Sequence, residues 1–159
     1  MRKYALFAMV FIGILTYAIV EIHATSVVLE PAAVESPPAG GKISFKVKVE
    51  NVKDLVGHQF DLVFDKTTLK FTSIEEGDFL KEGGAAKTYP FITVNGQMVS
   101  LQNPITPDVA QNVNSTGVLM AASVRLGTGG NLKGVDGTGE LATVTFEALV
   151  AKESKIELK

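Results

Sequence analysis

Hydrophobic and polar residues alternate along several short stretches of the chain, which is the pattern of strands with one buried face. The central stretch is Val56–Glu75, in which Phe60, Leu62 and Phe64 occupy every second position. Asp65 then breaks the pattern, because an Asp side chain can accept hydrogen bonds from backbone N–H groups ahead of it and so favours a turn. The apolar spacing restarts directly afterwards. This stretch therefore predicts a strand, a tight corner and a second strand.

The same reasoning predicts strands elsewhere. Asn95-Gly96 is the strongest hairpin signal in the chain. Outside the central stretch, strands are expected at Thr25–Glu30, Lys42–Glu50, Tyr89–Val94, Gln97–Gln102, Val118–Leu126, Leu141–Val150 and Ser154–Leu158. Asn103–Thr116 is expected to be a long surface loop with room for one helical turn after Pro107, and the glycine-rich stretch Gly127–Gly139 a second loop. Eight or nine short strands without a convincing amphipathic helix predict an all-β sandwich of antiparallel strands.

The first 24 residues differ from the rest. Arg2 and Lys3 precede an uncharged apolar run, Tyr4–Val20, and Ala24 supplies the small residue that signal-peptide cleavage requires. We therefore expect a signal peptide over residues 1–24, a domain over residues 25–159 and a secreted or cell-surface protein. The alternative is a retained N-terminal membrane anchor, because the apolar run is only slightly shorter than a membrane span.

Composition narrows the classes of function. The chain has 159 residues, a net charge of −2 and no cysteine. One domain of this size can bury enough surface to be stable without disulfides. A weakly acidic chain without a basic run gives no reason to expect a nucleic-acid partner.

Residues suited to catalysis are scarce. His58 is the only histidine after the N-terminal segment, and no histidine, cysteine or acidic residues stand at metal-ligand spacing. The acidic group Glu75, Glu76 and Asp78 is interpreted as a polar turn rather than a glycosidase pair. The glycines after Leu126 lack the spacing of a phosphate-binding loop, and Asp136 alone supplies too few oxygens for calcium. We expect neither an enzyme nor a bound metal or cofactor.

Two segments resemble the cohesin family. Phe60–Leu80, F-D-L-V-F-D-K-T-T-L-K-F-T-S-I-E-E-G-D-F-L, is similar to the cohesin segment with an aromatic-Asp corner followed by a strand and a Gly-Asp turn. Gly137–Leu149, G-T-G-E-L-A-T-V-T-F-E-A-L, is similar to the cohesin segment in which a glycine turn leads into an alternating strand. Glu153–Leu158 resembles the strand after it.

The resemblance implies a nine-stranded jelly-roll sandwich that is not catalytic. Cohesins bind dockerins, which are small helical modules, through one flat sheet face, and so assemble extracellular polysaccharide-degrading complexes. The contact positions that the resemblance implies here are Gly57, Gln59, Asp61, Ser123 and Arg125.

Two departures from the family accompany the resemblance. Asn95–Gly117 is interpreted as an insertion, and no residues follow Lys159 to form the family's last strand, so we expect either a fragment or an open sheet edge.

The leading hypothesis is a secreted, dockerin-binding module. The alternative is a carbohydrate-binding or surface-structural sandwich. A flat polysaccharide-binding platform usually needs exposed Trp or Tyr side chains. After the N-terminal segment the chain has no Trp and a single Tyr, Tyr89. A polysaccharide-binding site in a groove is therefore the alternative that stays open.

Overall fold

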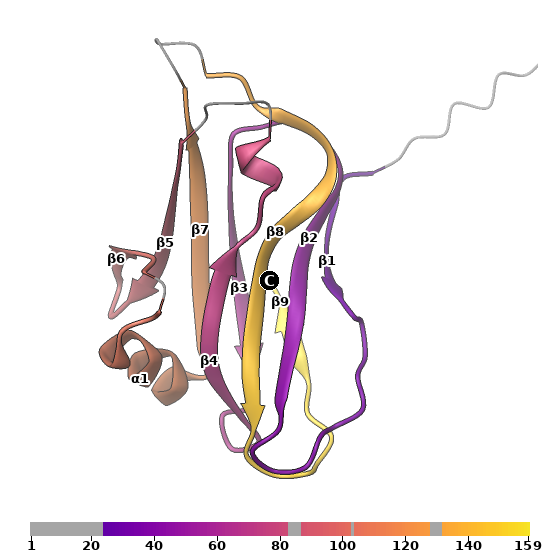
Figure 1. Cartoon of the computed structure of the whole chain (residues 1–159), viewed down its shortest axis with the longest axis vertical. Helices are drawn as coiled ribbons and strands as arrows, with labels where there is room; N and C mark the ends of the chain where they lie inside the picture. The colour runs from indigo at the N-terminus through magenta and orange to yellow at the C-terminus, as the bar shows by residue number, and fades with distance from the viewer. Residues whose placement is uncertain (1–23, 83–86, 103, 128–131) are drawn as a thin grey trace, which may run out of the picture.

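The computed structural model describes residues 24–82, 87–102, 104–127 and 132–159. Within this part of the chain, two antiparallel sheets pack face to face (Figure 1). The elements are β1 (Ser26–Glu30), β2 (Lys42–Leu55), β3 (Gly57–Phe64), β4 (Leu69–Glu76), the 3₁₀ turn η1 (Phe79–Lys81), β5 (Lys87–Val94), β6 (Gln97–Ser100), α1 (Pro107–Thr116), β7 (Val118–Leu126), β8 (Val135–Ala148) and β9 (Ile156–Leu158). The predicted all-β sandwich is confirmed.

The two sheets have the orders β1-β2-β8-β4 and β6-β5-β7-β3-β9. Neighbouring strands in both are antiparallel. The central strands β8 and β2 are long, and positive φ angles at Asn51, Asp54 and Gly137 accompany bulges where their pairing shifts register.

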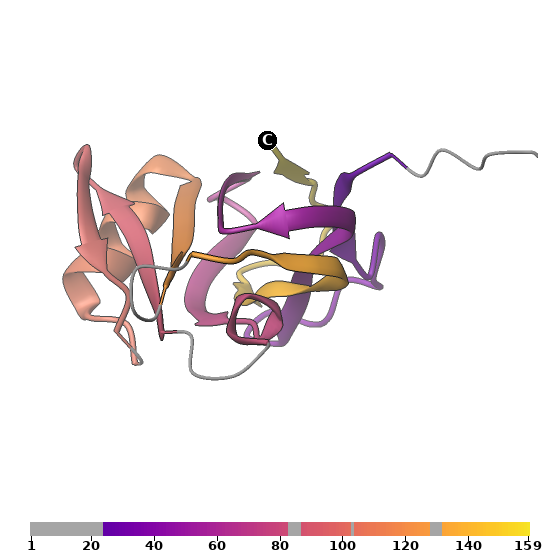
Figure 2. The ribbon, with the colours of Figure 1, turned by 90° about the horizontal axis from the view of Figure 1, so that it is seen from above.

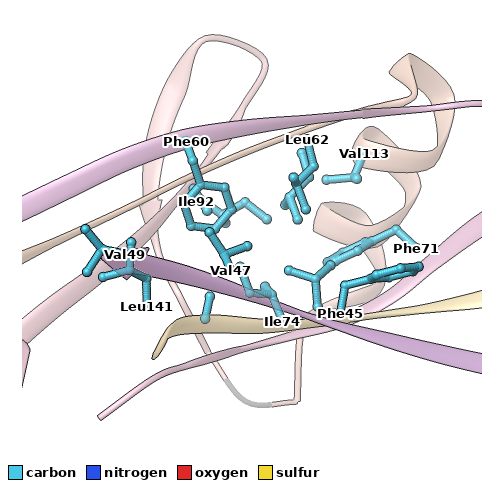
Figure 3. Close-up of a cluster of buried hydrophobic side chains, with 14 of the residues drawn as sticks. Phe45, Val47, Val49, Phe60, Leu62, Phe71, Ile74, Ile92, Val113 and Leu141 are labelled. Atoms are coloured by element: carbon cyan, nitrogen blue, oxygen red, sulfur yellow. The ribbon is translucent and has the colours of Figure 1, made fainter. Parts of the chain in front are cut away.

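Alternating residues of both sheets meet in one hydrophobic core (Figure 3). Phe146 of β8 is fully buried, and the rings of Phe64, Phe71 and Phe45 lie 4.9, 6.2 and 6.4 Å from it in edge-to-face arrangements. Such aromatic pairs add to the free energy gained from burial alone. The inward position predicted from the alternation is confirmed for Phe64.

The corner between β3 and β4 forms as predicted. The Asp65 carboxylate accepts hydrogen bonds from the hydroxyl and the backbone N–H of Thr67, at 2.6 and 2.9 Å. These bonds lower the pKa of Asp65, with the hydroxyl contributing most. The turn fixes where Leu69 re-enters the core.

The expected loop at Asn103–Thr116 is wrong, because Pro107–Thr116 forms helix α1. Pro107 stands in the first turn, where its missing N–H costs nothing, and Gly117 ends the helix in the left-handed conformation with φ of 72°. Val113 is fully buried, and α1 closes the sandwich between β4 and the β5–β6 hairpin (Figure 2). Burial of one face against the sheets therefore stabilises a helix that the polar sequence of the segment does not predict.

The expected loop at Gly127–Gly139 is also partly wrong, because β8 already begins at Val135. Residues 128–131 of that stretch lie outside the described residues, as does the expected signal peptide except for Ala24. In the part that is described, no helix is long and apolar enough to cross a membrane.

The last strand, β9, pairs antiparallel with β3 and forms one edge of the five-stranded sheet. Asp61 and Lys159 exchange backbone hydrogen bonds of 3.0 and 2.9 Å just beyond it. At the edge of the other sheet, β1 pairs with β2. The expectation of either a fragment or an open sheet edge stays a prediction.

Candidate functional site

The outer face of the five-stranded sheet is the candidate site. On β3, Phe60 and Leu62 are buried, so Gly57, Gln59 and Asp61 lie on the opposite, outward side. Gln59 is exposed, and Gly57 and Asp61 are half-buried. These three predicted residues are therefore brought together on one face.

Ser123 and Arg125 do not lie on that face, and their expected placement was wrong by one residue. Ser123 pairs with His58 and is only 1% exposed, and its hydroxyl donates a 2.6 Å hydrogen bond to Glu76. The guanidinium of Arg125 donates to the carbonyl oxygens of Leu80 and Glu82, at 2.7 and 2.6 Å. Arg125 therefore anchors η1 and the residue that follows it from the inner side of β7.

The reason for this error is that apolar residues occupy both sides of β7. Leu119 and Ala121 face the core on the same side as the polar Ser123 and Arg125, and the outward residues are apolar, so alternation cannot identify the faces. The register with β3 decides it, because Gln59 pairs with Ala122. The outward residues of β7 are Val118, Met120, Ala122, Val124 and Leu126.

Sequence reasoning missed the contribution of β5 and β6 to this face. Tyr89 pairs with Val124 and Phe91 with Ala122, so both aromatic rings point outward, 6.4 Å apart and nearly parallel. Met98 of β6 pairs with Thr93 and joins the same face. The Asn95-Gly96 turn was the available signal, since it fixes which residues of the hairpin share a side.

The two outer faces of the sandwich differ in chemistry. On the four-stranded sheet, lysines pair with acids: Lys46 lies 2.8 Å from Glu140 and Lys70 lies 3.6 Å from Glu147. The Lys46 pair raises the pKa of the lysine and lowers that of Glu140. On the five-stranded sheet, aromatic and aliphatic side chains are exposed instead.

Between the sheets, a polar cluster surrounds Glu76. Its carboxylate accepts hydrogen bonds from Ser123 and, at 2.9 Å, from Thr88, and Lys81 lies 3.4 Å away. Both ring nitrogens of His58 are buried and have no hydrogen-bond partner among the described residues. Burial lowers the pKa of His58 to about 4, and the charge of Glu76 offsets this only in part.

This cluster does not have the geometry of a catalytic site. The Ser123 hydroxyl donates to a carboxylate rather than to an imidazole, and it is closed to solvent. His58 stacks on Phe60 with ring centroids 5.8 Å apart, as a core side chain would. The cluster therefore positions η1 and β7 against the core.

The described residues contain no group of three His, Cys, Asp or Glu side chains that could hold a metal ion. Asp136, considered for calcium, instead accepts a 2.7 Å hydrogen bond from the backbone of Asp54. The Asp54 carboxylate in turn accepts from the backbone of Gly134 at 2.8 Å. These two acids tie the bulged ends of β2 and β8 together.

Comparison with known proteins identifies the family. The model of the cohesin domain matches residues 27–159, which is most of the chain and all of the described sandwich except Ser26, the first residue of β1. The chain belongs to the cohesin domain family. A search of curated proteins finds no match for this cohesin domain.

Solved cohesin structures share the fold at low sequence identity. The second type II cohesin module of the scaffoldin ScaA from Acetivibrio cellulolyticus is 15% identical, with a TM-score of 0.61 over 87% of this chain and 77% of that one. The chain from a type I cohesin–dockerin complex of Clostridium thermocellum is 14% identical, with a TM-score of 0.57 and coverages of 86% and 82%. A non-cellulosomal cohesin from the archaeon Archaeoglobus fulgidus is 15% identical, with a TM-score of 0.54 and coverages of 86% and 75%.

Proposed function

We propose that this cohesin domain is a non-catalytic binding module that docks a dockerin-type partner on the outer face of its five-stranded sheet. Membership of the cohesin family is the observation that carries the proposal. Its structural neighbours include cohesins solved in complex with dockerins from Acetivibrio cellulolyticus and Clostridium thermocellum. The expected setting is a secreted or cell-surface complex that acts on polysaccharides.

The contrast between the two outer faces supports the choice of face. On the four-stranded sheet, Lys46 and Lys70 form ion pairs with Glu140 and Glu147 of the same surface. The five-stranded sheet exposes apolar side chains that gain free energy when a partner covers them. The five-stranded sheet is therefore the better candidate for the docking surface.

The binding positions proposed on β3 are Gly57, Gln59 and Asp61. Gly57 keeps the surface low, since a Cβ there would lie 3.0 Å from the backbone oxygen of Ser123 and 3.2 Å from Val124. One carboxylate oxygen of Asp61 is shielded from solvent and accepts no hydrogen bond from the described residues.

Binding of dockerin modules from the same genome, measured by calorimetry, tests the proposal. Ala122→Arg places a long charged side chain at the centre of the face and should abolish binding. Ser44→Arg is the matched control on the outer face of the other sheet, where Ser44 bonds to Thr145, and should leave binding unchanged. Both variants must keep the circular dichroism spectrum of the wild type. Equal loss in the two variants, or binding to no dockerin, contradicts the proposal.

A second candidate function is carbohydrate binding on the same face. The stacked pair of the exposed Tyr89 and the half-buried Phe91 favours it, because aromatic faces stack on sugar rings. Retention on insoluble polysaccharide that Tyr89→Ala abolishes, in a protein that binds no dockerin, would support this candidate over the first.

A further inference from the structure

The proposed docking face is not uniform. Its β3–β9 side carries polar and charged residues, namely Gln59, Asp61, Glu157 and Lys159. Its β5–β6–β7 side is apolar. We define the anchor patch as five outward apolar residues of that side: Tyr89, Phe91, Met98, Met120 and Val124.

The anchor patch is open to solvent. Met98 is 68% exposed, Tyr89 48% and Val124 42%. These side chains are contiguous across three neighbouring strands, because Tyr89 pairs with Val124 and the hairpin places Met98 beside β5. Tyrosine is enriched among the residues that dominate interface energies, and methionine adapts to irregular partner surfaces. The patch therefore holds most of the apolar area that docking could bury.

The hairpin that carries Met98 is supported from behind. At its tip, the Asn112 amide of α1 donates a 2.6 Å hydrogen bond to the side-chain oxygen of Asn95. Its inner face, which includes Ile92 and Val99, meets α1 around a pocket of about 310 Å³. The helix thus holds the hairpin in the plane of the sheet before any partner arrives, which lowers the entropy cost of binding.

Charges on this face lie at its margins. Lys87 begins β5, and Asp61 lies on β3. At the β9 edge, Glu157 already pairs with Lys155 at 2.8 Å and with Lys159 at 3.8 Å. Few charges therefore remain to attract a partner, and the attraction that they do supply is screened by salt.

We infer that the anchor patch, rather than the polar residues of β3, supplies most of the affinity, and that the partner presents an apolar surface to it. This inference rests on the proposed function and names the chemistry of the partner. The β5–β6 hairpin then acts as a specificity element, because it adds a strand and an exposed methionine to the docking face. Gln59 and Asp61 fix orientation at the rim of the interface.

The test uses the dockerin that binds the wild type. Tyr89→Ala and Met98→Ala should each raise Kd by about 30-fold, the usual range for an anchor residue, and Gln59→Ala by less than about 3-fold. Raising NaCl from 0.05 to 0.5 M should change Kd by less than about 3-fold. Lys46→Ala, on the other sheet, is the control and should have no effect.

Four results would overturn the inference. The first is a larger loss of affinity with Gln59→Ala or Asp61→Ala than with the two anchor variants. The second is a change of Kd by more than about tenfold across the salt series. The third is self-association in sedimentation experiments that Met98→Ala abolishes, which would assign the patch to a second copy of the chain. The fourth is retention on polysaccharide that Tyr89→Ala abolishes. Binding of no dockerin at all defeats the proposed function instead.

Discussion

Replacing His58 by phenylalanine should make the domain more stable and less sensitive to acid. His58 lies between the sheets beside Ser123 and stacks on Phe60. Neither of its ring nitrogens forms a hydrogen bond with any of the described residues. An unsatisfied buried polar group costs about 1–3 kcal/mol, whereas an apolar ring of similar shape fills the same space without that cost. At pH 7 we therefore expect His58→Phe to raise the free energy of unfolding by about 1 kcal/mol.

Protonation gives the larger effect. The pKa of His58 falls from 6.5 to about 4 on folding, chiefly because burial disfavours the charged ring, and Glu76 partly counters this. Because the folded pKa is depressed, the unfolded state binds the proton first. Stability is therefore complete above pH 6.5, declines as the pH falls toward 4, and has then lost up to about 3 kcal/mol through this one residue.

Urea unfolding followed by circular dichroism at pH 7.0, 6.0, 5.0 and 4.5 measures both effects. The quantity to compare is the difference in unfolding free energy between His58→Phe and the wild type, since shared titration of the carboxylates cancels in it. That difference should grow steadily as the pH falls. If the two proteins instead lose stability in parallel between pH 6.5 and 4.5, His58 is not buried in neutral form and the reasoning fails.

Three further changes should destabilise the fold, each measured by urea unfolding. Asn114→Ala should cost about 1–3 kcal/mol, because the Asn114 amide pairs with both backbone groups of Phe71, at 2.7 and 3.0 Å, and alanine leaves them unpaired; an unchanged midpoint would contradict this. Phe146→Ala should lower the free energy of unfolding by about 3–5 kcal/mol, because it leaves a cavity among three rings. A decrease below about 1 kcal/mol would contradict close packing around this ring. Gly77→Ala should cost at least about 1–3 kcal/mol, because the added Cβ would overlap the backbone of Glu140; a neutral result would mean that β8 shifts freely.

Much of the fold follows from local chemistry. The period-two spacing of Phe60, Leu62 and Phe64 is sufficient to predict β3, and the Asp65 side chain predicts the corner that follows. Helix α1 carried usable signals as well, with Pro107 at its start and Gly117 at its end. They were outweighed by a polar composition, because only Val113 is fully buried on that helix.

The candidate site was harder to predict. Gly57, Gln59 and Asp61 could be placed outward because their strand is strictly alternating. Ser123 and Arg125 could not be placed, because apolar residues occupy both sides of their strand, its polar residues face inward, and a shift of one residue exchanges its faces.

The sequence by itself determined that this chain forms an antiparallel sandwich, where its central corner lies, and which side of β3 faces outward. These properties depend on side chains a few positions apart. Only the tertiary structure decided the composition of the proposed docking face, since the pairing of Tyr89 with Val124 and of Gln59 with Ala122 joins strands distant in the sequence. The reason is physical: alternation assigns two faces to each strand, but cross-strand register alone assembles those faces into one surface.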